Sequence, residues 1–115
     1  MNLSGGAAKL KITIGENDMV YQRPLYEAIL FAAKKYKLSG ATVVKGVLSY
    51  GAHSMNQSVK VFELSSDKPV IIELIDYPER LTDFADIARK LMDKAEAGGI
   101  IIIEDIEVLH YGAGK

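Results

Sequence analysis

Apolar and polar residues alternate near the start of the chain. Leu10, Ile12 and Ile14 are separated by single polar residues, and a period of two is typical of a strand with one buried face. The glycine and acidic residues at positions 15–18 favour a turn. We therefore predict a strand over residues 9–14, preceded by a flexible, glycine-rich leader over residues 1–7.

Two later segments have apolar residues at spacings of three and four, which predicts amphipathic helices. They begin at Pro24 and Pro78, because proline fits the first turn of a helix. Glycines at positions 40, 98 and 99 provide the stop signals. The apolar stripes consist of Leu25, Ala28, Ile29, Ala32, Ala33 and Tyr36 in the first helix, and of Leu81, Phe84, Ile87, Ala88, Leu91, Met92 and Ala95 in the second.

Three segments rich in β-branched and aliphatic residues predict further strands over residues 42–48, 70–75 and 100–108. The polar stretch between the first two predicts a long loop over residues 49–67, which includes a small strand over residues 59–64. This order of elements predicts an α+β, ferredoxin-like βαββαβ sandwich, an antiparallel sheet with both helices on one face. A length of 115 residues fits a single domain spanning residues 1–115.

The later strands are more apolar than two helices can cover. Val43, Val44, Val47 and Leu48 are apolar on both faces of their strand, and the strands over 70–75 and 100–108 share this property. An antiparallel sheet with one face in water alternates instead. Because large exposed apolar patches mark interfaces, we predict that the protein self-associates.

Composition excludes several classes of function. The 14 basic and 15 acidic residues are well mixed and leave a net charge of −1, whereas nucleic-acid binders have a clustered basic surplus. The absence of cysteine excludes disulfides and thiolate sites. His53 and His110 are the two histidines, and their spacing predicts no metal site. No apolar run approaches membrane length and the start lacks a signal-peptide pattern, so we expect a cytoplasmic protein.

Four segments resemble, in order, the PII-like fold: LKITIGEND (10–18), RPLYEAIL (23–30), LSGATVVKGVLSYGAHS (38–54) and LSSDKPVIIELID (64–76). The resemblance is to the domain-of-unknown-function branch, which is related to the nitrogen-regulatory PII signalling proteins. It implies a homotrimer with small ligands, adenine nucleotides above all, in clefts between subunits. It also implies that the loop over residues 49–67 is a signalling loop that docks on a partner protein.

The resemblance further implies which residues form the cleft. They belong to the end of the second strand, the base of the loop and the turn before the last strand: Gly46, Leu48, Ser49, Tyr50, Gly51, His53, Ser54, Gly98, Gly99 and Ile100. Glycines in such turns leave backbone N–H groups accessible and can form anion-binding concavities. Ile100 stands where nitrogen-regulatory members carry a lysine, and the loop lacks the tyrosine that is modified in them.

Several of these side chains have a structural alternative. Tyr50 either stacks on an adenine ring or anchors the base of the loop, and His53 either donates to a phosphate or is solvated. Arg23 is a possible ligand contact that could meet a phosphate bidentately, or it pairs with Glu27. Lys45 either faces the cleft or protects a strand edge.

Three acidic residues have competing interpretations of the same kind. Glu16 and Asp18 could hold a ribose hydroxyl or a cation, although capping of the next turn is the more frequent role of acidic residues there. Glu73 lies in an apolar strand, so its carboxylate needs a partner. We expect an ion pair with Lys9 or Lys11 on a neighbouring strand.

We weigh three functions. An acylphosphatase-like enzyme on this fold needs an arginine in the loop after the first strand, where residues 15–18 are acidic. An RNA-binding sheet needs aromatic residues on its central strands, and residues 9–14 and 70–75 have none. No nucleophile–base or paired-carboxylate pattern predicts catalytic residues or a required cofactor. The sequence therefore favours a ligand-binding regulator that is not an enzyme.

Overall fold

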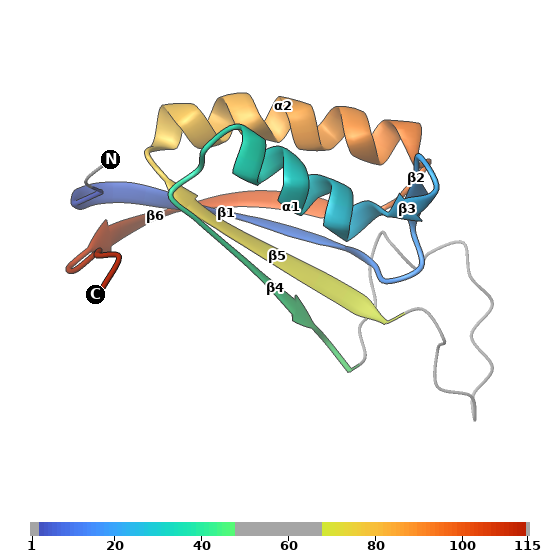
Figure 1. Cartoon of the computed structure of the whole chain (residues 1–115), viewed down its shortest axis with the longest axis horizontal. Helices are drawn as coiled ribbons and strands as arrows, with labels where there is room; N and C mark the ends of the chain where they lie inside the picture. Colours follow the sequence, from blue (N-terminus) through green and yellow to red (C-terminus); the bar gives the residue numbers. More distant parts are fainter. Residues whose placement is uncertain (1–2, 48–67, 115) are drawn as a thin grey trace.

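A four-stranded antiparallel sheet carries two helices on one of its faces (Figure 1). The computed structural model describes residues 3–47 and 68–114 of the chain. The elements are β1 (Gly5–Gly15), β2 (Met19–Val20), β3 (Arg23–Pro24), α1 (Leu25–Lys35), β4 (Gly40–Lys45), β5 (Pro69–Asp76), α2 (Pro78–Lys94) and β6 (Ile100–Val108). The strand order β4-β5-β1-β6 confirms the predicted ferredoxin-like sandwich.

The core lies between the sheet and the two helices. Leu10, Ile12 and Ile14 of β1 are at most 2% exposed, as their alternation predicted. The two predicted helical stripes meet them from the other side, with Ile29 and Phe84 both fully buried. Each such side chain contributes about 1.5–3 kcal/mol to folding by leaving water, so the helices and the sheet stabilise each other.

β1 begins earlier than the alternation predicted. It starts at Gly5 rather than at residue 9, because β6 pairs with its residues 5–13, from Gly5 opposite Val108 to Thr13 opposite Ile100. Leu3 is also buried. The expected flexible leader over residues 1–7 is therefore wrong for residues 5–7, which belong to the sheet.

Other boundaries differ by a few residues. β4 spans Gly40–Lys45 instead of residues 42–48, whereas β6 has the predicted bounds. The small hairpin of β2 and β3 was not predicted, since two-residue strands leave no periodic pattern. The expected loop over residues 49–67 and its small strand lie outside the described residues.

Asp76 joins the ends of several elements at one end of the sheet. Its buried carboxylate accepts hydrogen bonds from the backbone N–H of Ser39 at 2.9 Å and from the Ser39 hydroxyl at 3.2 Å. Arg80 of α2 lies beside the same carboxylate and donates to the carbonyls of Tyr36 and Lys37. The cluster thereby connects the end of α1 to the start of α2 and sets the position of β4.

The sheet face opposite the helices exposes apolar side chains. Ile101 packs against the core, so Ile100 and Ile102 point to the open face, where they are 55% and 40% exposed. Val44 at the other edge is 45% exposed. The pattern of strands apolar on both faces thus leads to an apolar surface that no described helix or strand covers, as expected.

Candidate functional site

The glycines of the predicted cleft lie at one end of the sheet, where β4 and β1 end and β5 and β6 begin. The backbone N–H of Gly46 donates to the carbonyl of Pro69 at 2.7 Å, which keeps Gly46 beside β5. Gly98 and Gly99 precede β6, whose first residues pair with Thr13 of β1. We call this end of the sheet, with Gly46, Gly98 and Gly99, the glycine end.

Gly99 is required by a close approach of two backbone segments. A Cβ atom at this position would lie 2.3 Å from the carbonyl oxygen of Thr13, and it would also crowd Ile14 and Met92. Only glycine fits such a distance. The residue therefore sets the turn that leads into β6, and this packing role accounts for glycine at this position without a ligand.

The two groups of predicted cleft residues lie on opposite edges of the sheet. Gly46 follows β4 at one edge, and Gly98, Gly99 and Ile100 begin β6 at the other, with β5 and β1 between them. Three strand spacings amount to about 14 Å. Within one chain, these groups therefore do not face a common small ligand.

Glu16 forms an ion pair across the glycine end. Its carboxylate lies 2.9 Å from the ammonium group of Lys45, which in turn lies 5.6 Å from the centre of the Tyr26 ring. The hydrogen bond and the negative charge of Glu16 raise the pKa of Lys45. The structure thus gives both residues a mutual partner, which the sequence reasoning did not identify because they are far apart in the chain.

Asp18 and Arg23 also take structural positions. The Asp18 carboxylate accepts a hydrogen bond from the N–H of Gly15 at 2.9 Å, in agreement with a role in the turn. The Arg23 guanidinium lies 5.2 Å from the centre of the Phe31 ring, a distance typical of a cation–π contact. The alternative pairing with Glu27 is not the contact that the structure shows.

The remaining predicted positions divide into described and undescribed ones. Leu48, Ser49, Tyr50, Gly51, His53 and Ser54 lie outside the described residues. Ile100 opens β6 with an exposed apolar side chain.

Over residues 3–47 and 68–114, no three His, Cys, Asp or Glu side chains gather as a metal site would require. No helix in those ranges is long and apolar enough to span a membrane.

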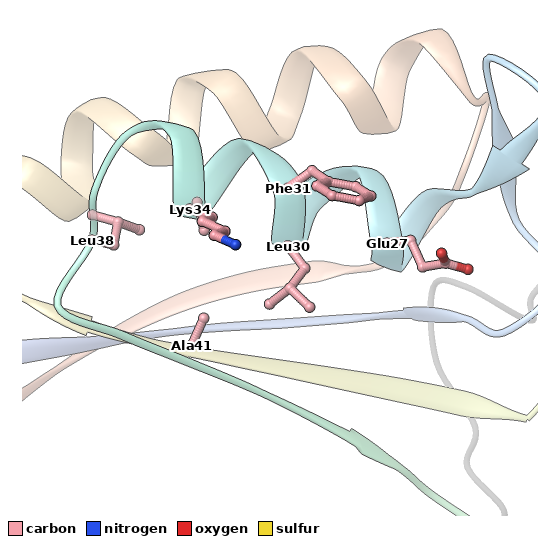
Figure 2. A pocket seen from close by; sticks show the side chains of 7 residues that line it. Glu27, Leu30, Phe31, Lys34, Leu38 and Ala41 are labelled. Atoms are coloured by element: carbon pink, nitrogen blue, oxygen red, sulfur yellow. The ribbon is translucent and has the colours of Figure 1, made fainter. Parts of the chain in front are cut away.

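A groove between α1 and β4 was missed by the sequence reasoning. It has a volume of about 450 Å³ and is lined by Glu27, Leu30, Phe31, Ala33, Lys34, Leu38 and Ala41. Figure 2 shows Leu30 pointing from α1 towards the sheet, with Ala41 on β4 across from it. Leu30 and Phe31 lie beside the predicted apolar stripe of the helix, and that excess of apolar surface was the available signal.

Solved structures with this fold include PII-like proteins. CPII from Thiomonas intermedia K12, bound to ADP, AMP and acetate, superposes with a TM-score of 0.66 at 16% identity, over 95% of this chain and 94% of that one. A putative PII-like signaling protein from Thermus thermophilus gives 0.55 at 14% identity, covering 89% of each chain. A phage SAM lyase in complex with S-methyl-5'-thioadenosine gives 0.50 at 16% identity, over 97% and 98%. The strand order and these similarities define a PII-like fold.

The sequence comparisons identify the family within this fold. The model of DUF190, described as an uncharacterized ACR, matches residues 7–108. A UPF0166 protein of Aquifex aeolicus is 33% identical over 101 residues, which is 88% of this chain and 91% of that protein. One from Methanocaldococcus jannaschii is 35% identical over 99 residues, 86% and 88% respectively. The chain belongs to the DUF190 family, which confirms the predicted PII-like branch of unknown function.

Proposed function

We propose that this protein is a PII-like regulator that binds an adenine nucleotide in clefts between the subunits of a homotrimer. The observation that carries the proposal is the separation of Gly46 from Gly98 and Gly99 on opposite edges of the glycine end. Two chains side by side could bring the β4 edge of one to the β6 edge of the other. Exposed apolar residues on the open face, Ile100 and Ile102 among them, supply surface for that association.

The ligand class rests on similar proteins and on backbone chemistry. CPII from Thiomonas intermedia K12 is described as bound to ADP, AMP and acetate and, in another structure, to ADP and bicarbonate. The turn that carries Gly98 and Gly99 can present N–H groups to an anion. Because Ile100 replaces a cation there, backbone donors are the proposed phosphate contacts on that side.

A regulatory role completes the proposal. The loop over residues 49–67 would transmit the bound state to a partner protein, in the cytoplasm and without chemistry on the ligand. The turn after β1 supports this, since its acidic groups are engaged by Lys45 and by the backbone of Gly15. An acylphosphatase-like reaction needs a cationic phosphate cradle at that turn, which these acidic groups do not provide.

Isothermal titration calorimetry against ADP, AMP, ATP, cyclic AMP and bicarbonate tests the proposal. We expect saturable binding of at least one adenine nucleotide, weakened about tenfold or more by Gly51→Val, because a branched side chain restricts the backbone near a ligand. Gly6→Ala is the matched control, since a Cβ there meets nothing within 4 Å. Absence of binding across the panel removes the nucleotide from the proposal. Unchanged affinity in Gly51→Val places the site elsewhere.

A further inference from the structure

A cavity lies between the second half of α2 and the start of β6. It has a volume of about 390 Å³, and its lining includes Arg89, Met92 and Asp93 of the helix, Ile101 of the strand, and the turn that carries Gly98 and Gly99. It therefore belongs to the glycine end, on the β6 side of the sheet. The proposed trimer brings the β4 edge of a neighbouring chain to this side, which makes the cavity one half of the proposed cleft.

The cavity combines an apolar floor with two charged groups. Met92 is 8% exposed and Ile101 packs against the core, so both present carbon surface. Arg89 and Asp93 are four residues apart on α2, which places them on the same face of the helix, about 6 Å apart along its axis. A ligand on the apolar floor thus meets a cation at one end and a carboxylate at the other.

The guanidinium of Arg89 is held from one side. Its Nη1 donates to Oδ1 of Asp86 at 2.7 Å, and Asp86 is the acceptor that the structure gives Arg89 within residues 3–47 and 68–114. A guanidinium has five N–H donors in a planar fork, so the other donors can bind an anion. Asp86 thereby positions Arg89 and leaves it able to bind a phosphate.

The carboxylate of Asp93 is suited to a hydroxyl group. It lines the same cavity and belongs to none of the ion pairs found among the described residues. An ionised carboxylate only accepts hydrogen bonds, so it repels a phosphate and binds a hydroxyl. Nucleotide-binding proteins of another fold use an acidic residue in this way to bind the ribose 2′-OH.

Lys94 is a second cation that precedes the same turn, but it is used elsewhere. Its ammonium group lies 5.9 Å from the centre of the Tyr21 ring, and Lys94 does not line the cavity. Ile100 has no charge to offer. Arg89 is therefore the cation that the described part of the chain places best for an anion at this turn.

We propose that Arg89 binds a phosphate and Asp93 binds the ribose 2′-OH of the nucleotide in this half of the cleft, which makes the protein selective for ribonucleotides. The inference rests on the proposed function and adds two specificity-determining residues to it. Neither residue is among the cleft positions that the resemblance implies. The backbone N–H groups of Gly98 and Gly99 complete the phosphate contact.

Isothermal titration calorimetry with the full chain tests the role of Arg89. The probes are ADP and AMP, the nucleotides described in CPII. We expect Arg89→Gln to weaken both about tenfold, because hydrogen bonds between charged groups are the stronger ones, and Arg89→Lys to recover part of this loss. Lys90→Gln is the matched control. It removes the same charge from an exposed neighbour outside the cavity and should change the affinities by less than about twofold.

A comparison with 2′-deoxy-ADP and 2′-deoxy-AMP tests the role of Asp93. The wild type should bind each ribonucleotide about fivefold more tightly than its deoxy form, because the analogue leaves the carboxylate without a donor. This preference should disappear in Asp93→Ala, whereas in Arg89→Gln it should persist although both affinities fall. Asp83→Ala, at an exposed position of α2 outside the cavity, should keep the preference.

The outcomes separate this inference from the proposed function. Binding of neither ADP nor AMP to the wild type would overturn the inference, and the wider panel then decides whether the proposed function falls with it. Saturable binding with equal effects of Arg89→Gln and Lys90→Gln, or equal affinities for the ribose and deoxyribose forms, would overturn this inference alone. Because residues 83, 89, 90 and 93 are exposed, we expect all the variants to fold, which circular dichroism checks.

Discussion

The buried carboxylate of Asp76 lies 3.2 Å from Nε of Arg80, four residues further along the chain. Nε is close to this charge without an aligned hydrogen bond, while Nη2 donates to the carbonyls of Tyr36 and Lys37 directly after α1. Asp76→Ala would leave the Ser39 N–H without its acceptor and the partly buried guanidinium without its counter-charge. We expect a loss of about 3–5 kcal/mol in the free energy of unfolding, measured by urea denaturation.

A second Asp–Arg pair on α2 is the control for this prediction. Asp86 and Arg89 lie 2.7 Å apart, but both side chains are more than 60% exposed. Asp86→Ala should change the free energy of unfolding by less than about 0.5 kcal/mol, because exposed pairs contribute little. Equal effects of the two substitutions would contradict the connecting role of Asp76.

Gly99→Ala tests the close approach of β1 to the turn before β6. Its Cβ would lie 2.3 Å from the Thr13 carbonyl oxygen, so the backbone must move. We expect a destabilisation of about 1–3 kcal/mol by chemical denaturation. Gly6→Ala, where a Cβ meets no atom within 4 Å, should be close to neutral, and a neutral Gly99→Ala would mean that the turn is looser than described.

The ion pair between Lys9 and Glu73 on the open face predicts a dependence of stability on pH. The nitrogen and oxygen are 3.0 Å apart, and the hydrogen bond and charge of Glu73 raise the pKa of Lys9 above its ordinary value of 10.5. The folded state thus holds this proton more tightly than the unfolded state. The stabilisation is fully present below pH 10.5 and is lost as the pH rises through the raised pKa.

Melting temperatures of the wild type and Lys9→Met, followed from neutral to strongly alkaline pH, measure this effect. We expect the wild type to be the more stable at neutral pH and the difference to shrink at alkaline pH. Lys11→Met is the matched control, since Lys11 directly opposes Glu73 in the strand register although the ion pair forms with Lys9. A pH-independent difference for Lys9→Met would exclude the titration as its cause.

Self-association through the open sheet face predicts different effects for two neighbours on β6. Ile102→Glu places a charge on that face, where Ile102 is 40% exposed, and should reduce the molar mass from a trimer to a monomer by light scattering. Ile103→Glu alters a side chain of similar exposure on the opposite face and should leave the trimer intact. A wild-type monomer at micromolar concentration would contradict both this prediction and the inter-subunit cleft.

The sequence by itself determined the elements that depend on local periodicity. The alternation of Leu10, Ile12 and Ile14 identified β1, and the helical stripes identified α1 and α2, because a side chain's burial follows from its direction on a regular backbone. The ion pair of Glu73 could also be predicted from the sequence, since a carboxylate in an apolar strand needs a cationic partner. The ferredoxin-like sandwich followed from the order of these elements, and the PII-like branch from the resemblance of four sequence segments.

Only the tertiary structure decided which distant segments meet. β1 extends to Gly5 because β6 pairs with it, and Glu16 meets Lys45 because their strands end at the same side of the sheet. The separation of Gly46 from Gly99 and the groove between α1 and β4 likewise depend on strand order. Such contacts join residues far apart in the chain, whereas hydrophobic periodicity records only which face of its own element a residue occupies.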